Sequence, residues 1–82
     1  MNDQVRASVR AFVVRRLDGI HVDDDENLFE RGYVNSLFAV QLVMWIERTF
    51  DVPVEGADLD IANIQSVTAI ASFVERKRAS VA

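Results

Sequence analysis

The chain has 82 residues, 50% of them hydrophobic and 27% charged, and its formal net charge is −4 at pH 7. This length predicts a single domain over residues 1–82. The absence of cysteine excludes disulfides, thiolate metal sites and a cysteine nucleophile. The longest nearly apolar run, residues 37–46, is far shorter than the roughly 20 residues that span a bilayer. We therefore expect a cytoplasmic protein without a membrane segment.

The charge is unevenly distributed along the chain. Residues 1–22 and 66–82 each carry a net charge of +2, whereas residues 23–65 carry ten acids against two arginines. An acidic middle third would steer a basic partner surface toward it. No basic stripe is present that would bind nucleic acid, so we expect protein partners and no nucleic-acid ligand.

The first element is an amphipathic helix over about residues 3–18. Its apolar side chains recur at helical spacing: Val5, Val9, Phe12, Val13 and Leu17. Arg15 and Arg16 fall in the last turn, where cations complement the helix dipole. Gly19 is well placed to end the helix in a left-handed conformation.

Residues 19–35 have no sustained periodicity and predict a long ordered loop. The apolar residues expected to hold it on the core are Ile20, Val22, Leu28 and Phe29. Loops of this length in compact domains are usually functional. The acidic run of residues 23–26 has neither the alternating ligands nor the central glycine of a calcium loop, so we expect no metal site.

The second helix, from about Ser36 to Phe50, is apolar on two faces. The face that we assign to the core holds Ala39, Leu42, Val43, Ile46 and Phe50. The opposite face holds Leu37, Val40 and Met44, beside Glu47. Phe38 and Trp45 lie along one flank. A chain this short cannot bury a helix on all sides, so the second face should stay exposed and serve as an interaction surface.

The C-terminal part predicts one short and one long helix. Pro53 and Gly56 interrupt the chain, and residues 59–64 can form at most a turn or two. Ser66 is the expected N-cap of a final helix. The side chains of this helix expected to face inward are Val67, Ile70, Ala71 and Val74. The predicted fold class is all-α, a small four-helix bundle with three longer helices, one short helix and a long loop between helices 1 and 2.

Ser36 stands in the first turn of the second helix, and its position allows two uses. Either Asn35 or Ser36 can cap the helix. A hydroxyl at this place can also carry a covalently attached phosphate, because a helix N-terminus favours negative charge. Both uses are compatible if Asn35 caps the helix and Ser36 points outward. A hydrolase nucleophile is disfavoured: the Gly-x-Ser-x-Gly motif is absent, and the only histidine, His21, lies in the loop without an evident orienting partner.

Residues 26–74 resemble the acyl carrier protein and peptidyl carrier protein family. The matching segments are Asn27–Gly32, Asn35-Ser36-Leu37, Val40–Val43, Ile46-Glu47 and Phe50–Val52, followed by Ile64–Val67 with Ile70. The N-terminal helix also fits the four-helix layout of this family, so the resemblance covers nearly the whole chain. The Ser-Leu pair alone is a weak signal, but its combination with the upstream loop, the downstream helix and the total length is fairly specific.

The resemblance implies that Ser36 is esterified with 4′-phosphopantetheine, which a phosphopantetheinyl transferase takes from coenzyme A. The thiol of this arm would hold an acyl group as a thioester, and the chain itself would have no catalytic residues. The implied partners are this transferase and acyl-loading, tailoring, acyltransferase or synthase enzymes. They would dock on the second helix and the loop before it. The contact residues that we expect are Asn35, Leu37, Val40, Met44 and Glu47.

One departure from the family pattern concerns the residue before the serine, which is usually aspartate and here is Asn35. Phe38 and Gln41 likewise occupy positions that many fatty-acid carriers give to acids. This pattern favours a dedicated partner recognised more by apolar contact. It suggests a discrete monomeric carrier of polyketide, antibiotic or related secondary metabolism, with an unusual extender unit such as methoxymalonyl or hydroxymalonyl. A polar, short cargo would then ride outside the bundle.

Three alternatives stay open at this point. The chain can be a carrier for an activated amino acid. It can be a degenerate carrier that has lost modification and serves as a subunit or regulator. It can also be an unmodified helical adaptor in which Ser36 is only a helix cap.

Overall fold

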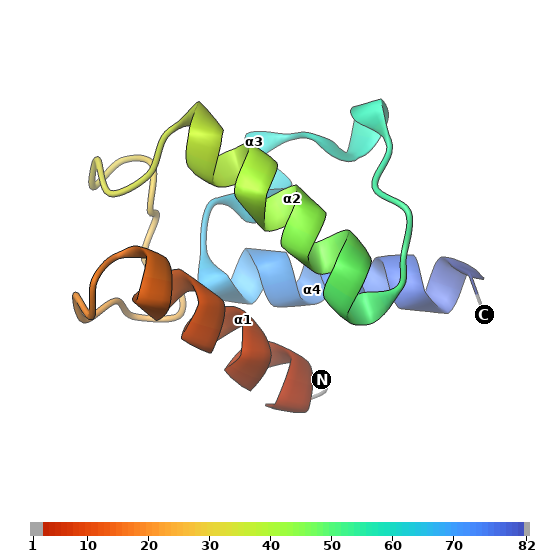
Figure 1. The fold of residues 1–82 in the computed structure, drawn as a ribbon, viewed down its shortest axis with the longest axis horizontal. Helices are drawn as coiled ribbons and strands as arrows, with labels where there is room; N and C mark the ends of the chain where they lie inside the picture. The colour runs from red at the N-terminus through yellow and green to blue at the C-terminus, as the bar shows by residue number, and fades with distance from the viewer. Residues whose placement is uncertain (1–2, 82) are drawn as a thin grey trace.

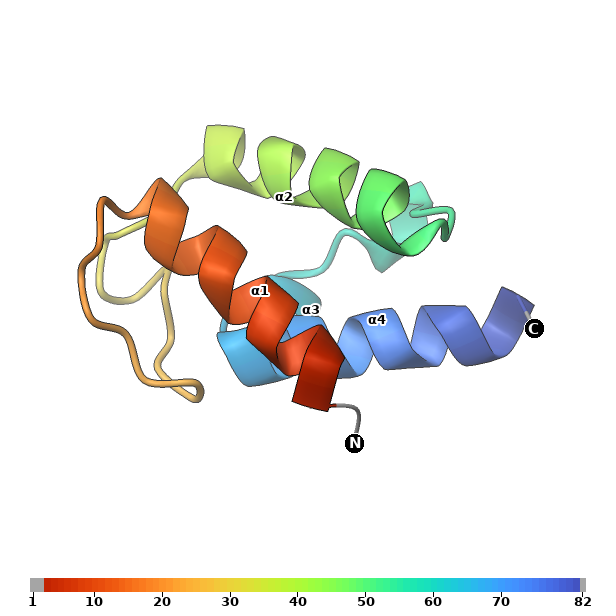
Figure 2. The same cartoon turned by 60° about the horizontal axis from the view of Figure 1, so that its bottom comes forward.

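The computed structural model describes residues 3–81, and the regular secondary structure of these residues is entirely helical. Its elements are α1 (Asp3–Arg16), α2 (Ser36–Phe50), the 3₁₀ turn η1 (Gly56–Asp58), α3 (Ile61–Ile64) and α4 (Val67–Val81). No strand occurs within residues 3–81. The predicted fold class is confirmed: α1, α2 and α4 are long, α3 is short, and a long loop joins α1 to α2 (Figure 1). Figure 2 shows α2 and α4 on opposite sides of the bundle, with this loop at the end where α2 begins.

One continuous apolar core joins the three longer helices. The inward residues predicted for α1 and α4 are all buried: Val5, Val9, Phe12, Val13, Leu17, Val67, Ile70, Ala71 and Val74. Burial of such a face, rather than helix propensity, stabilises helices of this length. Ser66 caps α4 as predicted, because its Oγ accepts a hydrogen bond from the Ala69 N–H at 3.0 Å.

The inward face of α2 differs from the predicted one. Leu42 and Ile46 are fully buried as expected, but the third buried residue is Phe38, which we placed on a flank. The other residues of the predicted core face, Ala39, Val43 and Phe50, are only half-buried. The Phe38 ring packs against Phe12 of α1, with ring centroids 6.1 Å apart. Because an aromatic ring gains more from burial than alanine, α2 turns this flank toward α1.

Helix α1 ends at Arg16, two residues earlier than predicted. Gly19 has a φ of 81°, which confirms its left-handed conformation, and Asp18 adopts a φ of 56° as well. The Gly19 N–H donates to the Val14 carbonyl at 2.9 Å, and the Asp18 N–H donates to the Arg15 carbonyl at 3.4 Å. This is the Schellman pattern, in which Asp18 is the first left-handed residue.

The α1–α2 loop is held by fewer apolar residues than predicted and by one ion-pair cluster. Val22 and Leu28 are buried, and Phe29 packs against the core. The prediction for Ile20 is wrong, since its side chain is 45% exposed. Polar contacts hold this part of the loop instead. Asp24 forms ion pairs with Arg6 and Arg10 of α1. Its backbone carbonyl accepts a hydrogen bond from the N–H of Thr68, in the first turn of α4.

Candidate functional site

The start of α2 is built by two adjacent residues with separate roles. Asn35 is the N-cap, with a φ of −140°, and its Oδ1 accepts a hydrogen bond from the Phe38 N–H at 3.1 Å. Ser36 is the first helical residue, and its side chain is exposed. The alternative in which Ser36 caps the helix is wrong, because Asn35 already performs that function. The Ser36 hydroxyl is therefore left for another use.

A single helical turn before α2 determines how the chain enters the site. The Asn27 side chain accepts hydrogen bonds from two successive backbone N–H groups, the first being that of Phe29 at 3.0 Å. Gly32 closes the turn with a φ of 76°, a conformation that a side chain disfavours. The Leu28 N–H donates to the Gln65 carbonyl at 2.8 Å, which anchors the turn to the α3–α4 junction. Residues 27–32, one of the segments that resemble the carrier protein family, therefore form an ordered turn anchored to the rest of the fold.

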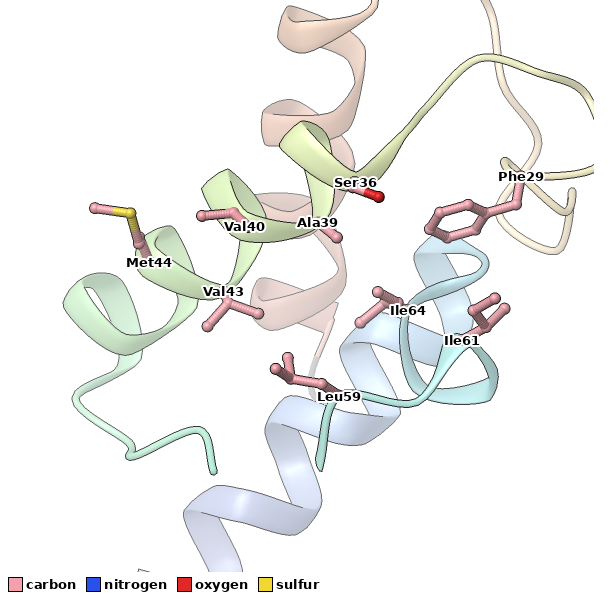
Figure 3. A pocket seen from close by; sticks show the side chains of 9 residues that line it. All are labelled: Phe29, Ser36, Ala39, Val40, Val43, Met44, Leu59, Ile61 and Ile64. Atoms are coloured by element: carbon pink, nitrogen blue, oxygen red, sulfur yellow. The ribbon is translucent and has the colours of Figure 1, made fainter. Parts of the chain in front are cut away.

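An apolar groove with a volume of about 480 Å³ lies beside Ser36, between α2 and the η1–α3 segment. Its walls consist of Ala39, Val40, Val43 and Met44 from α2 and of Leu59, Ile61 and Ile64 from the opposite side. Ser36 and Phe29 lie together at one end, and the Ser36 oxygen points to the side where Phe29 lies (Figure 3). Ser36 is the only polar residue of this lining, so the groove favours apolar groups.

The electrostatics at the start of α2 favour an anion on Ser36. The first turn of α2 contains no acidic residue, and Asn35 adds no charge. Within residues 3–81, the N–H groups of Ser36 and Leu37 have no hydrogen-bond partner. Free N–H groups and the positive end of the helix dipole suit a phosphate. A serine-linked phosphodiester therefore fits the residues present here.

The structure places the predicted apolar contact residues on the surface, in a row that begins next to Ser36. Leu37 is 63% exposed, Val40 56% and Met44 51%. Asn35 is also exposed at the start of this row. Glu47 is exposed at the far end, where its carboxylate accepts a hydrogen bond from the Val54 N–H at 3.0 Å.

Two exposed apolar residues opposite α2 were missed by sequence analysis. Leu59 is 56% exposed and Ile61 58%. Both lie on the far wall of the groove (Figure 3). Their segment is too short to show helical periodicity, so only its apolar composition could have indicated a surface role.

The far wall of the groove is fastened to α4 by polar contacts. Lys77 donates to the Asp58 carboxylate at 2.8 Å, and Arg76 donates to the Asn63 side chain, also at 2.8 Å. The hydrogen bond from Lys77, followed by one from the Glu55 N–H, lowers the pKa of Asp58 below its usual value. Together with the buried Ile64 side chain, these contacts hold the η1–α3 segment against α4.

Two further features bear on the class of protein. Residues 3–81 contain no cluster of three or more histidine, aspartate or glutamate side chains that could hold a metal ion. Over the same described residues, each helix is too short or too polar to cross a membrane.

A small helical bundle with an exposed serine at the positive end of a helix, beside an apolar groove, has the features of a module that carries a covalently attached group. The family model described as "Phosphopantetheine attachment site" matches residues 5–74. The chain is also 30% identical over 61 residues to the D-alanyl carrier protein of Lactococcus lactis subsp. lactis (strain IL1403), covering 74% of this chain and 77% of that protein.

The chain therefore belongs to the phosphopantetheine-binding family of acyl and peptidyl carrier proteins. Carrier domains of this family bear a covalently attached 4′-phosphopantetheine. They are not enzymes themselves. They interact with a phosphopantetheinyl transferase and with loading or synthase enzymes.

Proposed function

We propose that this chain is an acyl carrier whose 4′-phosphopantetheine is attached to Ser36. The observation that carries this proposal is the exposed Ser36 hydroxyl at the first position of α2, with the capping performed by Asn35. In the attachment step, a separate transferase binds coenzyme A. The Ser36 oxygen loses its proton, forms a bond to phosphorus and displaces adenosine 3′,5′-bisphosphate. Once attached, the group supplies a terminal thiol that holds the cargo as a thioester.

The residues around Ser36 have distinct roles in this proposal. The N–H groups of Ser36 and Leu37 would donate to the phosphodiester. Asn35 orients the first turn without placing a negative charge next to it. Phe29 and the α2 side of the groove offer an apolar surface at the base of the arm. A polar, short cargo would lose hydration there without gaining a partner, so it would stay in solvent.

For the cargo, we propose an acyl group of polyketide or related secondary metabolism, such as a methoxymalonyl or hydroxymalonyl unit. Support comes from Asn35 and from α2, whose only charged residues are Glu47 and Arg48. Such a helix suits a dedicated partner more than the shared enzymes of fatty-acid synthesis. A second candidate is an activated amino acid, and the similarity to a D-alanyl carrier protein favours it. The mass of the thioester-bound cargo on protein isolated from its own cells separates these two candidates.

The proposal is tested by incubating the purified chain with coenzyme A and a promiscuous phosphopantetheinyl transferase. The intact mass should rise by one arm, and Ser36→Ala should abolish the gain. Ser80→Ala is the matched control, because Ser80 is also exposed but lies at the end of α4. No gain with any of several transferases would contradict the proposal. A gain that appears only after Asn35→Asp would support the degenerate carrier instead.

A further inference from the structure

A second groove, of about 160 Å³, lies on the other side of the exposed α2 row. It is lined by Arg16 at the end of α1 and by Gln41, Met44, Trp45 and Arg48 of α2. We call this the arginine groove. It contains two cations and no acid, although the chain as a whole has a net charge of −4.

Aromatic packing holds the base of the arginine groove in place. The Trp45 ring stacks on Phe12, with centroids 4.6 Å apart, and forms a T-shaped pair with Phe50, with centroids 5.4 Å apart. The Arg16 guanidinium lies over the Phe12 ring, 5.1 Å from its centroid. Stacking of this kind reduces the freedom of both the indole and the guanidinium before any partner arrives.

The two cations of the arginine groove are not neutralised by a carboxylate of the described chain. Within residues 3–81, neither Arg16 nor Arg48 forms an ion pair, and both side chains are exposed. By contrast, two of the loop carboxylates that we expected to attract a basic partner, Asp24 and Glu26, are paired with arginines of this chain. The flank of the exposed row that faces the arginine groove therefore carries unpaired positive charge, whereas Glu47, at the far end of the row, accepts a hydrogen bond from the Val54 N–H.

Met44 connects the two grooves, because it lines both of them and is 51% exposed between them. A partner that covers the groove beside Ser36 would cover Met44 as well. Arg48 lies twelve positions after Ser36, which corresponds to about 18 Å along a helix axis. A single interface of ordinary size, about 800 Å² on each partner, spans that length.

We propose that the enzymes that load or unload this carrier dock on α2 with an acidic segment. One of its carboxylates pairs with Arg16 and Arg48, and a neighbouring apolar side chain packs on Met44 and Trp45. Arginine suits this contact, because its planar guanidinium group can donate two parallel hydrogen bonds to one carboxylate and is weakly hydrated. This inference rests on the proposed function, since it assigns the partner that reaches the arm on Ser36.

The test uses photo-crosslinking of the full chain in the cells that naturally make it. p-Benzoyl-phenylalanine replaces Gln41, which lines the arginine groove and is half-buried. Crosslinked partners are identified by the mass of the captured peptide. We expect a protein that acylates or deacylates the arm, captured through a peptide containing Asp or Glu next to an apolar residue.

Charge variants then decide whether the arginines carry the contact. The double change R16E/R48E should lower the crosslinking yield at least about tenfold, because like charges placed opposite each other at an interface are strongly unfavourable. The control R15E/R78E changes the net charge equally, also in the last turns of two helices, and should leave the yield unchanged. R16K/R48K keeps the charge but loses the planar fork, so it should lower the yield less than R16E/R48E does. Replacing the captured acid of the partner by arginine should restore capture of R16E/R48E.

Several outcomes would overturn the inference. These are an unchanged yield for R16E/R48E, an equal loss for R15E/R78E, a captured peptide without an acid, or capture of lipid or of a second copy of the chain. The mass gain with coenzyme A and transferase is measured on the same wild-type protein. If that gain is absent, the proposed function itself fails. If it is present and capture ignores the charge reversal, only the docking inference fails.

Discussion

Asn35→Ala should lower the stability of the protein, whereas Ser36→Ala should leave the stability nearly unchanged and abolish attachment of the arm. The Asn35 side chain accepts one hydrogen bond, from the Phe38 N–H at 3.1 Å, and satisfies a donor that α2 cannot satisfy internally. Loss of such a cap typically costs about 0.5–2 kcal/mol, and we expect about 1 kcal/mol here. Within residues 3–81 the Ser36 hydroxyl has no hydrogen-bond partner, so Ser36→Ala should change stability by less than about 0.5 kcal/mol.

Urea unfolding followed by far-ultraviolet circular dichroism separates the two cases. With a denaturant slope of about 1 kcal/mol per molar urea for a small domain, Asn35→Ala should lower the midpoint by about 1 M. Ser36→Ala should leave the midpoint nearly unchanged while abolishing attachment of the arm. Asn35→Asp is the control, because aspartate keeps the cap and adds a favourable charge at the helix N-terminus. If Ser36→Ala destabilised the protein as much as Asn35→Ala, the assignment of a free hydroxyl would be refuted.

Three further outcomes are expected. Leu42→Ala should lower the free energy of unfolding by about 2–5 kcal/mol, measured in urea, because this side chain is 0% exposed and leaves a cavity. Gly32→Ala should cost about 1–2 kcal/mol through its left-handed backbone alone, since an added Cβ meets nothing within 4 Å. The hydrogen bond from Lys77 lowers the pKa of Asp58 in the folded state. The ionised Asp58 therefore stabilises the fold fully above its unfolded pKa of about 3.9, and this stabilisation is lost as the pH falls through the lower folded pKa. Asp58→Asn should therefore be less stable than wild type at pH near 7, and unfolding midpoints should converge below about pH 4; a constant difference would contradict this pairing.

Periodicity was sufficient to predict which segments are helical, because each long helix buries a stripe of apolar side chains on a common core. It could not determine the rotation of α2. That rotation depends on the ring of Phe12 in another helix, which favours burial of Phe38 over Ala39. The role of Asp24 was also not predictable, since its arginine partners lie 14 and 18 positions away.

Part of the candidate site could likewise be predicted from the sequence, and part could not. Ser36 and its neighbours on α2 could be identified from the sequence, because the cap, the serine and the apolar row are local features. The far wall of the groove could not be predicted, because it is held by tertiary contacts: Asp58 and Asn63 bond to α4, and Ile64 is buried in the core. The arginine groove also joins two helices, and neither arginine is distinctive in the sequence.

The most direct measurement is mass spectrometry of the protein isolated from the cells that make it, with fragmentation of the peptide that contains Ser36. We expect this peptide to carry the arm, and mild release to yield an acyl or aminoacyl group that was bound as a thioester. A Ser36 peptide without the arm, in cells where the chain is present and performing its role, would contradict attachment at Ser36.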